Sequence, residues 1–530
     1  MEKIATDIYS FENLRKGGYV YVDKTDFLWR LASDTVDRQF FISRPRRFGK
    51  SLMLSTLKCL FEGRRELFKG LKVEKKRWGW QKKWPVVMLN MADVTASSVD
   101  ELKEGLVDTV DELVRTFGLK DVVRMSNPGK YLGNFFKALA ETKGEFVVLV
   151  DEYDVPLQGF LGDRVALVRV RKLMHDFYIQ LKNNEANIRF LMLAGVTKLT
   201  KVSVFSGLNH LTDLTMKRKE YASLLGYTPK EIAAFFPKRL DALAKKRKTD
   251  REGALKLILG WYDSYRFSHL SAARVCNPIS VGQALATSAL QGYWIGTAMS
   301  TLVMERIAAA GKTPDDFEGC TATVDELDLC DALKLPAKSL MYQSGYLTIK
   351  GLSKTEVDGI GNPKLILGAP NREVRGAIRD GWFDSILNVP ATEFDALVDV
   401  AKRQVAAGDV RNLIGETLYR IYAKIPPEWR IKSEADVKRH FRLFMEMLGA
   451  KVAAEEGSAF GYADAIIETK KFVWVFEFKF NKSAKAAIRQ IREKGYADAY
   501  RGDRRPVTLV GINFRAAKRN IDEPLFAMMR

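Results

Sequence analysis

Short hydrophobic runs alternate with amphipathic stretches along the N-terminal part of the chain. Apolar segments at 85–91, 145–154 and 188–196 have the length and composition of buried strands. Segments 98–115 and 131–142, which lie between them, space their apolar residues at helical intervals. Strands that alternate with helices form a parallel sheet covered by helices on both faces. The pattern therefore predicts an α/β domain with a parallel sheet at the N-terminus.

The C-terminal part predicts a different order of elements. Pro426 and Pro427 mark a linker, because neither residue can extend a preceding helix. The pattern after them predicts an α-β-β-α-β unit, with a helix at 433–449, strands around 462–469 and 472–480, a helix at 482–499 and a strand at 506–513. The stretch before the linker, from about 215 to 425, has a mostly helical pattern and few recognisable functional motifs.

The chain of 530 residues is too long for one hydrophobic core, because domains typically span about 50–250 residues. We expect an N-terminal α/β domain at 1–214, a mainly helical middle or lid region at 215–425, and a separate C-terminal domain at 428–530.

A basic turn at 43–51, Ser-Arg-Pro-Arg-Arg-Phe-Gly-Lys-Ser, follows a short strand and opens a helix. This placement is typical of a P-loop (Walker A), in which backbone N–H groups and the helix N-terminus surround phosphates. Lys50 would neutralise β/γ-phosphate charge, Ser51 would ligate Mg²⁺, and Gly49 would allow close backbone approach. Arg44 stands where the first glycine of the motif is expected. The predicted nucleotide-binding residues of the turn are Arg46, Arg47, Phe48, Gly49, Lys50, Ser51 and Leu52.

A buried strand ending in Asp151 and Glu152 has the Walker B arrangement. We expect Asp151 to hold Mg²⁺ and Glu152 to polarise the attacking water, with Asp154 close enough to assist. The next apolar strand ends near Thr197, which is the candidate for contact with the γ-phosphate or the attacking water. Lys198 is the second candidate there, and an ordinary threonine-rich loop is the alternative.

A second set of polar residues lies near the C-terminus. Glu477 and Lys479 share one face of their strand, because side chains alternate along a strand. Pairing with the preceding strand would bring Asp464 to Glu477, and paired carboxylates can hold Mg²⁺ and activate water. Lys479 would orient that water or neutralise a phosphate, and Gln490 is expected nearby on the following helix. Thus Asp464, Glu477, Lys479 and Gln490 form the predicted phosphodiester-cleaving site.

Two further features of the sequence are weaker. Glu455 or Glu456 would be an additional metal ligand, although a solvated loop is slightly favoured. Arg266, in the middle region, would be able to reach a γ-phosphate.

The net charge of +20 favours polyanionic partners, nucleic acid first, with simple solubility as the alternative. Basic residues gather between 481 and 505, beside the predicted cleavage site. The four cysteines form no CxxC pair, and the four histidines are scattered, so neither a zinc site nor a disulfide framework is expected. The chain shows neither a signal peptide nor an apolar run of about 20 residues, so a cytoplasmic protein without membrane contact is expected.

Several motifs together resemble the AAA-ATPase-like family of many bacteria and some archaea. They are GYVYVDKTDFL at 18–28, RPRRFGKSLMLSTL at 44–57, VVLVDEYDVPL at 147–157, VSVFSGLN at 202–209 and WYDSYRF at 261–267. The resemblance implies an ATP-binding P-loop domain in which RPRRFGKS is the family's usual loop. It also implies that Lys50, Ser51, Asp151 and Glu152 have their usual roles.

The stretch at 458–500 is similar to the PD-(D/E)XK nuclease superfamily, a domain that members of the AAA-ATPase-like family frequently carry at this place. Relatives often have Gly-Arg-x-Asp before the first strand, and Tyr462 here replaces the arginine. This puts one phosphate or structural contact in doubt but not the metal ligands.

The combined expectation is an ATP-binding and ATP-hydrolysing protein whose Mg²⁺-dependent nuclease domain cuts DNA or RNA under nucleotide control. A homo-oligomer formed through the ATPase domain is compatible with it. The alternative is an ATP-dependent switch that binds nucleic acid or a protein partner without cleaving.

Overall fold

The structure divides into two compact units, and each is described by itself. The computed structural model of this chain describes residues 2–198, 211–294, 303–304, 306–307, 312–328, 336–353, 364–386, 391–425, 431–448, 450, 452–453, 457–458 and 461–529. The first unit comprises Met1–Met299 and Asp316–Arg375, and the second comprises Ser300–Asp315 and Gly376–Arg530. The expected middle region contributes to both units, and the three-part division drawn from the sequence stays a prediction.

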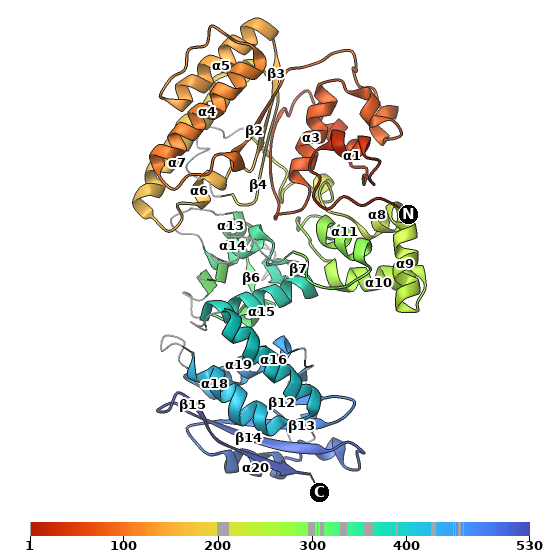
Figure 1. Ribbon diagram of the computed structural model, residues 1–530, viewed down its shortest axis with the longest axis vertical. Helices are drawn as coiled ribbons and strands as arrows, with labels where there is room; N and C mark the ends of the chain where they lie inside the picture. Colours follow the sequence, from red (N-terminus) through yellow and green to blue (C-terminus); the bar gives the residue numbers. More distant parts are fainter. Residues whose placement is uncertain are drawn as a thin grey trace, which may run out of the picture. The chain divides into compact units, whose positions relative to one another are not determined.

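A five-stranded parallel sheet forms the centre of the first unit (Figure 1). Its strands are, in spatial order, β2 (Val86–Asn90), β3 (Phe146–Asp151), β4 (Ile188–Gly195), β1 (Gln39–Ser43) and β5 (Thr212–Asp213). All residues of β1 and β3 are buried, as the apolar runs predicted for strands covered on both faces. β4 separates β1 from β3, so the basic turn and the acidic strand end lie two strands apart at one edge of the sheet.

Helices lie on both faces of this sheet. Figure 1 shows α4, α5 and α7 on one side and α1 and α3 on the other. The helices of this part are α1 (Phe11–Lys16), α2 (Thr25–Ser33), α3 (Lys50–Phe61), α4 (Val99–Phe117), α5 (Pro128–Lys143), α6 (Val155–Gln158) and α7 (Arg164–Asn183). In α4, Leu102, Leu106, Val110 and Leu113 are buried at helical spacing, and the Ser98 side chain caps the first turn. The amphipathic pattern thus gives α4 one buried face.

The first unit continues into a helical part and a small sheet. Its helices are α8 (Pro229–Phe235), α9 (Pro237–Arg247), α10 (Arg251–Tyr262), α11 (Pro278–Thr287), α13 (Val324–Asp328) and α14 (Ala337–Ser344). The sheet is antiparallel, with the order β6 (Thr321–Ala322), β8 (Leu365–Gly368) and β7 (Thr348–Leu352). The predicted helical character of the middle region is confirmed. The small sheet was not predicted, because its short strands carry too few residues for a period-2 pattern.

The second unit contains the end of α15 (Arg372–Ile386), a helix that starts in the first unit. It is followed by α16 (Ala391–Ala407), α17 (Val410–Asn412), a π-helical turn at Leu413–Leu418, and α18 (Tyr419–Ala423). Within the described residues, no helix is both long and apolar enough to cross a membrane.

A mixed five-stranded sheet ends the chain. The elements are α19 (Glu434–Met447), β9 (Val452–Ala453), β12 (Ala465–Glu468), β13 (Val473–Phe480), α20 (Ala484–Glu493), β14 (Val507–Arg515) and β15 (Asn520–Met528), with a separate pair β10 (Gly457–Ser458) and β11 (Gly461–Tyr462). The spatial order is β15-β14-β13-β12-β9, with β13 and β14 parallel and the other pairs antiparallel. The predicted α-β-β-α-β order is present, and β15 extends it.

Alternation along β13 sends neighbouring side chains to opposite faces. Phe476 and Phe478 pack against Phe441 of α19, with ring centroids 4.7 and 4.9 Å apart. Val473 and Val475 belong to a core cluster with residues of α20 on the other face. Glu477 and Lys479 continue this second row. The strand is therefore held by packing on both faces close to its polar end.

Three sequence features lie outside the described residues: the motif at 202–209, the Pro426–Pro427 linker and the Glu455–Glu456 pair.

Candidate functional sites

The turn between β1 and α3 has the backbone shape of a phosphate-binding loop. Gly49 has a φ of 92° and immediately precedes the first residue of α3, Lys50. No atom lies near the position of an added Cβ, so the backbone angle itself, and not crowding, favours glycine there. Arg47 also has a positive φ, of 65°. The turn thus presents the free N–H groups of a helix N-terminus to one cavity.

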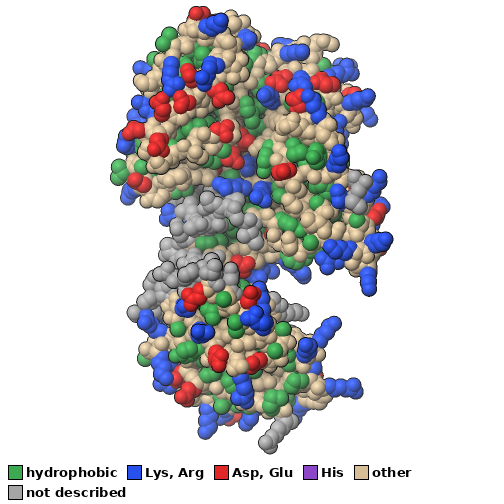
Figure 2. All heavy atoms as spheres, viewed as in Figure 1, with side chains coloured by type: hydrophobic (Ala, Val, Ile, Leu, Met, Phe, Trp, Pro, Cys, Tyr) green, Lys and Arg blue, Asp and Glu red, His purple; other side chains and the backbone are tan. Residues whose placement is uncertain are grey.

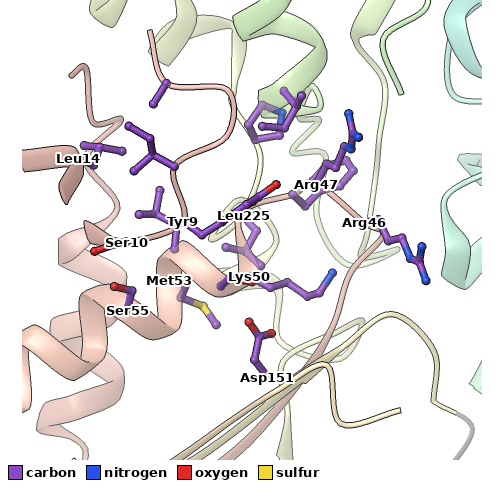
Figure 3. A pocket seen from close by; sticks show the side chains of 18 of the residues that line it. Tyr9, Ser10, Leu14, Arg46, Arg47, Lys50, Met53, Ser55, Asp151 and Leu225 are labelled. Atoms are coloured by element: carbon purple, nitrogen blue, oxygen red, sulfur yellow. The ribbon is translucent and has the colours of Figure 1, made fainter. Parts of the chain in front are cut away.

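The cavity has a volume of about 820 Å³, within the range of ligand sites. All of the predicted loop residues line it, namely Arg46, Arg47, Phe48, Gly49, Lys50, Ser51 and Leu52. Asp151 and Glu152 form its acidic wall, and Figure 3 shows Lys50 and Asp151 at its floor. The structure therefore brings together the two motifs that are about a hundred residues apart in the sequence.

Lys50 is almost completely buried beneath the loop. Its ammonium donates hydrogen bonds to the carbonyl oxygens of Arg44 and Pro45, each at 3.0 Å. Burial lowers the pKa of this lysine, and the nearby carboxylates of Asp151 and Glu152 oppose that change. The two hydrogen bonds thus hold the ammonium of Lys50 in one place beneath the loop.

Asp151 is buried at the end of β3, and burial raises its pKa. A hydrogen bond with the Ser51 side chain lowers that pKa in turn, so the hydroxyl and the carboxylate are direct neighbours. An oxygen pair of this kind suits Mg²⁺, which is bound by one or two protein groups together with substrate phosphates.

Glu152 lies directly beyond the strand with a φ of 49°, an uncommon angle for a residue with a side chain. Its backbone N–H donates to Asp151 Oδ1 at 3.0 Å, and burial raises the pKa of its carboxyl group. Non-glycine residues in this backbone region are enriched at functional sites, because the fold must compensate for their strain.

Thr197, the predicted γ-phosphate contact, lies elsewhere. It is fully buried, and its hydroxyl and backbone N–H donate to Asp154 Oδ2 at 2.6 and 2.8 Å. It is not among the residues that line the cavity. Lys198 likewise pairs with Asp213, at 2.9 Å, and with Asp328. The end of β4 is therefore tied to neighbouring structure, and Asp154 ties β3 to β4.

Two features around the site were missed by the sequence reasoning. Arg44 is buried, donates to the Ser43 and Thr215 carbonyls at 2.9 and 3.0 Å, and packs over the Phe267 ring. This explains how an arginine replaces the first glycine of the motif. The opposite wall of the cavity comes from distant segments, namely Ile8, Tyr9, Leu225, Tyr227, Pro278 and Ile279. No local pattern marks such residues, because the fold alone brings them together.

In the second unit, three carboxylates converge at the polar end of β13. Single oxygens of Glu434, Asp464 and Glu477 all lie within 4.8 Å of one another. Lys479 pairs with Glu477 at 2.7 Å, and Lys438 pairs with Asp464 at 2.5 Å. The Asp464, Glu477 and Lys479 side chains named from the sequence are therefore together.

Glu477 is the most deeply buried member of this cluster. Burial raises its pKa to about 7, the hydrogen bond from Lys479 lowers it, and the charge of Asp464 raises it further. Among the residues that the structure describes, its Oε2 has no hydrogen-bond partner, whereas Asp464 Oδ2 accepts from the Phe478 N–H at 2.8 Å. Three convergent carboxylates with a buried, unsatisfied oxygen fit a divalent cation that prefers oxygen ligands.

Glu434 and Lys438 were not predicted as site residues. Both lie near the start of α19, where Ser433 caps the first turn, and their i,i+4 spacing puts them on one face. The cap and the acidic first turn were visible in the sequence, but they are common at ordinary helix starts. The Gln490 side chain donates a hydrogen bond to the Tyr496 hydroxyl at 3.2 Å, and this bond does not involve the three carboxylates of the cluster.

Two of the basic residues between 481 and 505 are already paired with carboxylates. Arg505 bonds to both Asp503 and Glu468, and Arg501 pairs with Asp498. Glu468 pairs with Val473, so Arg505 lies at the end of β13 opposite Glu477. Lys482 and Lys485, at the start of α20, are exposed. On the face shown in Figure 2, Lys and Arg side chains are scattered among acidic ones and do not form one patch.

Comparison with known proteins now gives the class of the chain. Residues 5–205 match the AAA-ATPase-like family of predicted AAA-ATPases, and residues 432–524 match the PD-(D/E)XK nuclease superfamily. The "Uncharacterized protein in vnfD 5'region" of Azotobacter chroococcum mcd 1 is 30% identical over 534 residues, covering 98% of each chain. The protein therefore belongs to the AAA-ATPase-like family and carries a PD-(D/E)XK nuclease superfamily domain at its C-terminus. This confirms the resemblance and the α/β fold class inferred from the sequence.

Two solved structures from Aeropyrum pernix also align with the chain. The ORC2 protein, in ADPNP–ADP complexes, is 13% identical with a TM-score of 0.26, and the match covers 84% of this chain and 86% of that one. The ORC1 protein in complex with DNA is 10% identical with a TM-score of 0.22, covering 68% and 92%.

Replacing Lys50 with alanine is expected to weaken ATP binding by about tenfold or more, because a charge-assisted contact to phosphate is lost. Calorimetric titration with ATP measures this. Lys58→Ala on the same helix is the matched control, because Lys58 lies outside the cavity and pairs loosely with Glu62 at 3.9 Å. Equal affinities for parent and Lys50→Ala would remove Lys50 from the site.

Glu152→Gln is expected to retain ATP binding and to lower turnover by about a hundredfold or more, since a general base is lost. Phosphate release under saturating ATP measures it, with the exposed Glu145→Gln at the other end of β3 as control. Unchanged turnover would assign the proton acceptor to another residue.

Glu434→Gln is expected to weaken Mn²⁺ binding to the second unit by about tenfold, because one of three carboxylates is lost. Calorimetric Mn²⁺ titration measures this in a Ser51→Ala background, which removes the other expected metal ligand. Exposed Glu493→Gln on α20 provides the control. If Glu434→Gln binds as the parent does, Glu434 is only a structural neighbour of Asp464 and Glu477.

Proposed function

We propose that this chain binds and hydrolyses ATP in its N-terminal cavity and cleaves nucleic acid at its C-terminal carboxylate cluster under control of the bound nucleotide. In this proposal residues 1–214 form the ATPase domain, 215–425 a mainly helical middle region, and 428–530 the nuclease domain. The observation that carries the cleaving activity is the convergence of Glu434, Asp464 and Glu477 within 4.8 Å beside Lys479.

For ATP, the loop amides and Lys50 would hold the β- and γ-phosphates, and Ser51 with Asp151 would hold Mg²⁺. The ion would supply charge neutralisation across the phosphates. Glu152 would orient the attacking water and accept its proton; its raised pKa makes the carboxylate a stronger base than an ordinary glutamate.

For the phosphodiester, Asp464, Glu477 and Glu434 would hold a divalent cation, which supplies a water of lowered pKa and neutralises phosphate charge. Lys479 is held at 2.7 Å from Glu477 and would orient the nucleophilic water or contact the scissile phosphate. The Phe478 N–H fixes Asp464, so the carboxylate that bridges β12 and β13 keeps its orientation without reorganisation. The exposed lysines of α20 would contact the nucleic acid backbone.

Nucleotide control is supported by the anchoring of α15, the helix that starts in the first unit and ends in the second. Glu373, in its first turn, accepts hydrogen bonds from the N–H groups of Tyr293 and Trp294, at 2.5 and 2.7 Å. It also accepts one from Ser280 at 3.1 Å, in the first turn of α11, whose residues Pro278 and Ile279 line the cavity. The hydrogen bond from Ser280 to Glu373 therefore links α11, which contributes to the cavity wall, with α15.

A second candidate function is a nucleotide-dependent switch that binds nucleic acid or a protein partner without cutting. The ion pairs of Lys438 with Asp464 and of Lys479 with Glu477 favour it, because both lysines already neutralise carboxylates of the cluster. A homo-oligomer formed through the ATPase domain is compatible with either function.

Incubation with plasmid DNA or with RNA in the presence of Mg²⁺ separates the two. The parent is expected to cleave, Asp464→Ala to lose cleavage completely, and Lys479→Ala to lose about a hundredfold or more, since each removes a group that acts in the transition state. The control is Asp498→Ala, an exposed aspartate of the same domain.

All variants should bind ATP as the parent does. Asp464→Ala should still bind nucleic acid, with an affinity that falls steeply as salt rises. A parent that binds nucleic acid but cleaves neither DNA nor RNA would favour the switch.

A further inference from the structure

The three arginines of the loop occupy three different environments. Arg44 is buried away from the cavity, bonded to backbone carbonyls and packed over the Phe267 ring at 4.3 Å. Arg47 is exposed and donates to the Tyr293 carbonyl at 3.3 Å. Figure 3 shows its side chain directed away from Asp151. Thus the side chain of Arg44 is directed into the protein interior, and that of Arg47 is directed outward.

Arg46 differs from both: like Arg47 it lines the cavity, but it is half-buried where Arg47 is exposed. In Figure 3 its side chain extends to the same side as the tip of Lys50. Burial lowers the pKa of Lys50, and the positive charge of Arg46 lowers it further. Burial raises the pKa of Glu152, and the charge of Arg46 opposes that rise. Its guanidinium is therefore close enough to act electrostatically on the phosphate-binding lysine and on the candidate base.

The guanidinium of Arg46 lacks an anionic partner among the residues that the structure describes. Its recorded hydrogen bond, at 3.4 Å, goes to the neutral side-chain oxygen of Gln158. Gln158 is itself fixed, because its Nε2 donates to the buried Asp154 at 2.9 Å. A partly desolvated cation held by a neutral acceptor gains strongly from an anionic ligand.

Arg266, the other candidate arginine, is already hydrogen-bonded to backbone carbonyl oxygens. Its Nε donates to the Ser271 carbonyl at 2.7 Å, and its Nη2 donates to the His269 carbonyl at 2.9 Å. It does not line the cavity. Arg46 is therefore the arginine best placed for a nucleotide phosphate.

From this geometry we infer that Arg46 contacts the γ-phosphate of ATP and stabilises its charge during hydrolysis, so that one chain carries its own arginine finger. The inference rests on the proposed ATPase function. Water adds to the γ-phosphorus, the bond to the β–γ bridging oxygen breaks, and ADP leaves with that electron pair. Glu152 accepts the proton of the water, and Arg46 stays protonated throughout. Such arginines act in cis or in trans, and the cis arrangement needs no second subunit.

The test compares a non-hydrolysable ATP analogue with ADP on the full-length chain. Arg46→Ala is expected to lose about tenfold or more in affinity for the analogue, while ADP affinity changes by less than about threefold, because the lost contact is to the γ-phosphate. ATP turnover should fall by about a hundredfold or more. Turnover per chain of the parent should stay constant over a hundredfold dilution. Arg46→Lys should recover much of the affinity ratio, and it replaces Arg46→Ala where the latter does not fold.

Arg38→Ala is the matched control, because Arg38 is exposed just before β1, at the strand end opposite the loop. An unchanged analogue-to-ADP affinity ratio in Arg46→Ala would overturn the inference while leaving the ATPase function standing. Parent turnover that rises with protein concentration would overturn the cis arrangement. A parent that binds neither nucleotide would overturn the proposed ATPase function as well.

Discussion

Burial of ionised side chains at strand ends is the constraint on which both sites depend. Lys50 and Asp151 are 5% and 4% exposed, and Glu477 and Lys479 are 1% and 5% exposed. Removing such groups from water costs free energy unless partners compensate. Burial therefore lowers the pKa of Lys50 and raises the pKa values of Asp151 and Glu477, which favours the neutral form of each group. For Lys50 the compensation is two hydrogen bonds to backbone carbonyls, and for Glu477 it is the ion pair with Lys479 at 2.7 Å.

The two units meet this constraint with different local geometry. In the first, the ends of β1 and β3 lie on either side of β4, and Arg47 and Glu152, which both have a positive φ, line one cavity. In the second, period-2 alternation along β13 places Glu477 and Lys479 on one face, and the antiparallel partner β12 starts next to Asp464. Packing of Phe476 and Phe478 on the opposite face fixes this register.

Local sequence patterns predicted the parts of each site that are close in sequence. The basic turn, the acidic strand end and the alternating Glu477–Lys479 pair follow from spacing rules that need no tertiary information. Spacing rules could not predict three other features: the place of Glu434 in the cluster, the cavity wall at Pro278–Ile279, and the bond between Thr197 and Asp154. Each depends on segments that are brought together only in the folded chain. The small antiparallel sheet was not predicted for another reason: its strands are too short to show the alternation of apolar and polar residues that marks a strand.

We propose that one chain holds two metal-dependent phosphate sites. Anomalous diffraction from crystals soaked with Mn²⁺ and a non-hydrolysable ATP analogue tests both sites together. We expect one Mn²⁺ at Ser51 and Asp151 beside the analogue's phosphates. A second Mn²⁺ is expected in the other unit, among Glu434, Asp464 and Glu477, with Lys438 or Lys479 displaced from its carboxylate. Analogue density in the cavity with no anomalous peak at the carboxylate cluster, at Mn²⁺ levels that fill the first site, would contradict this proposal.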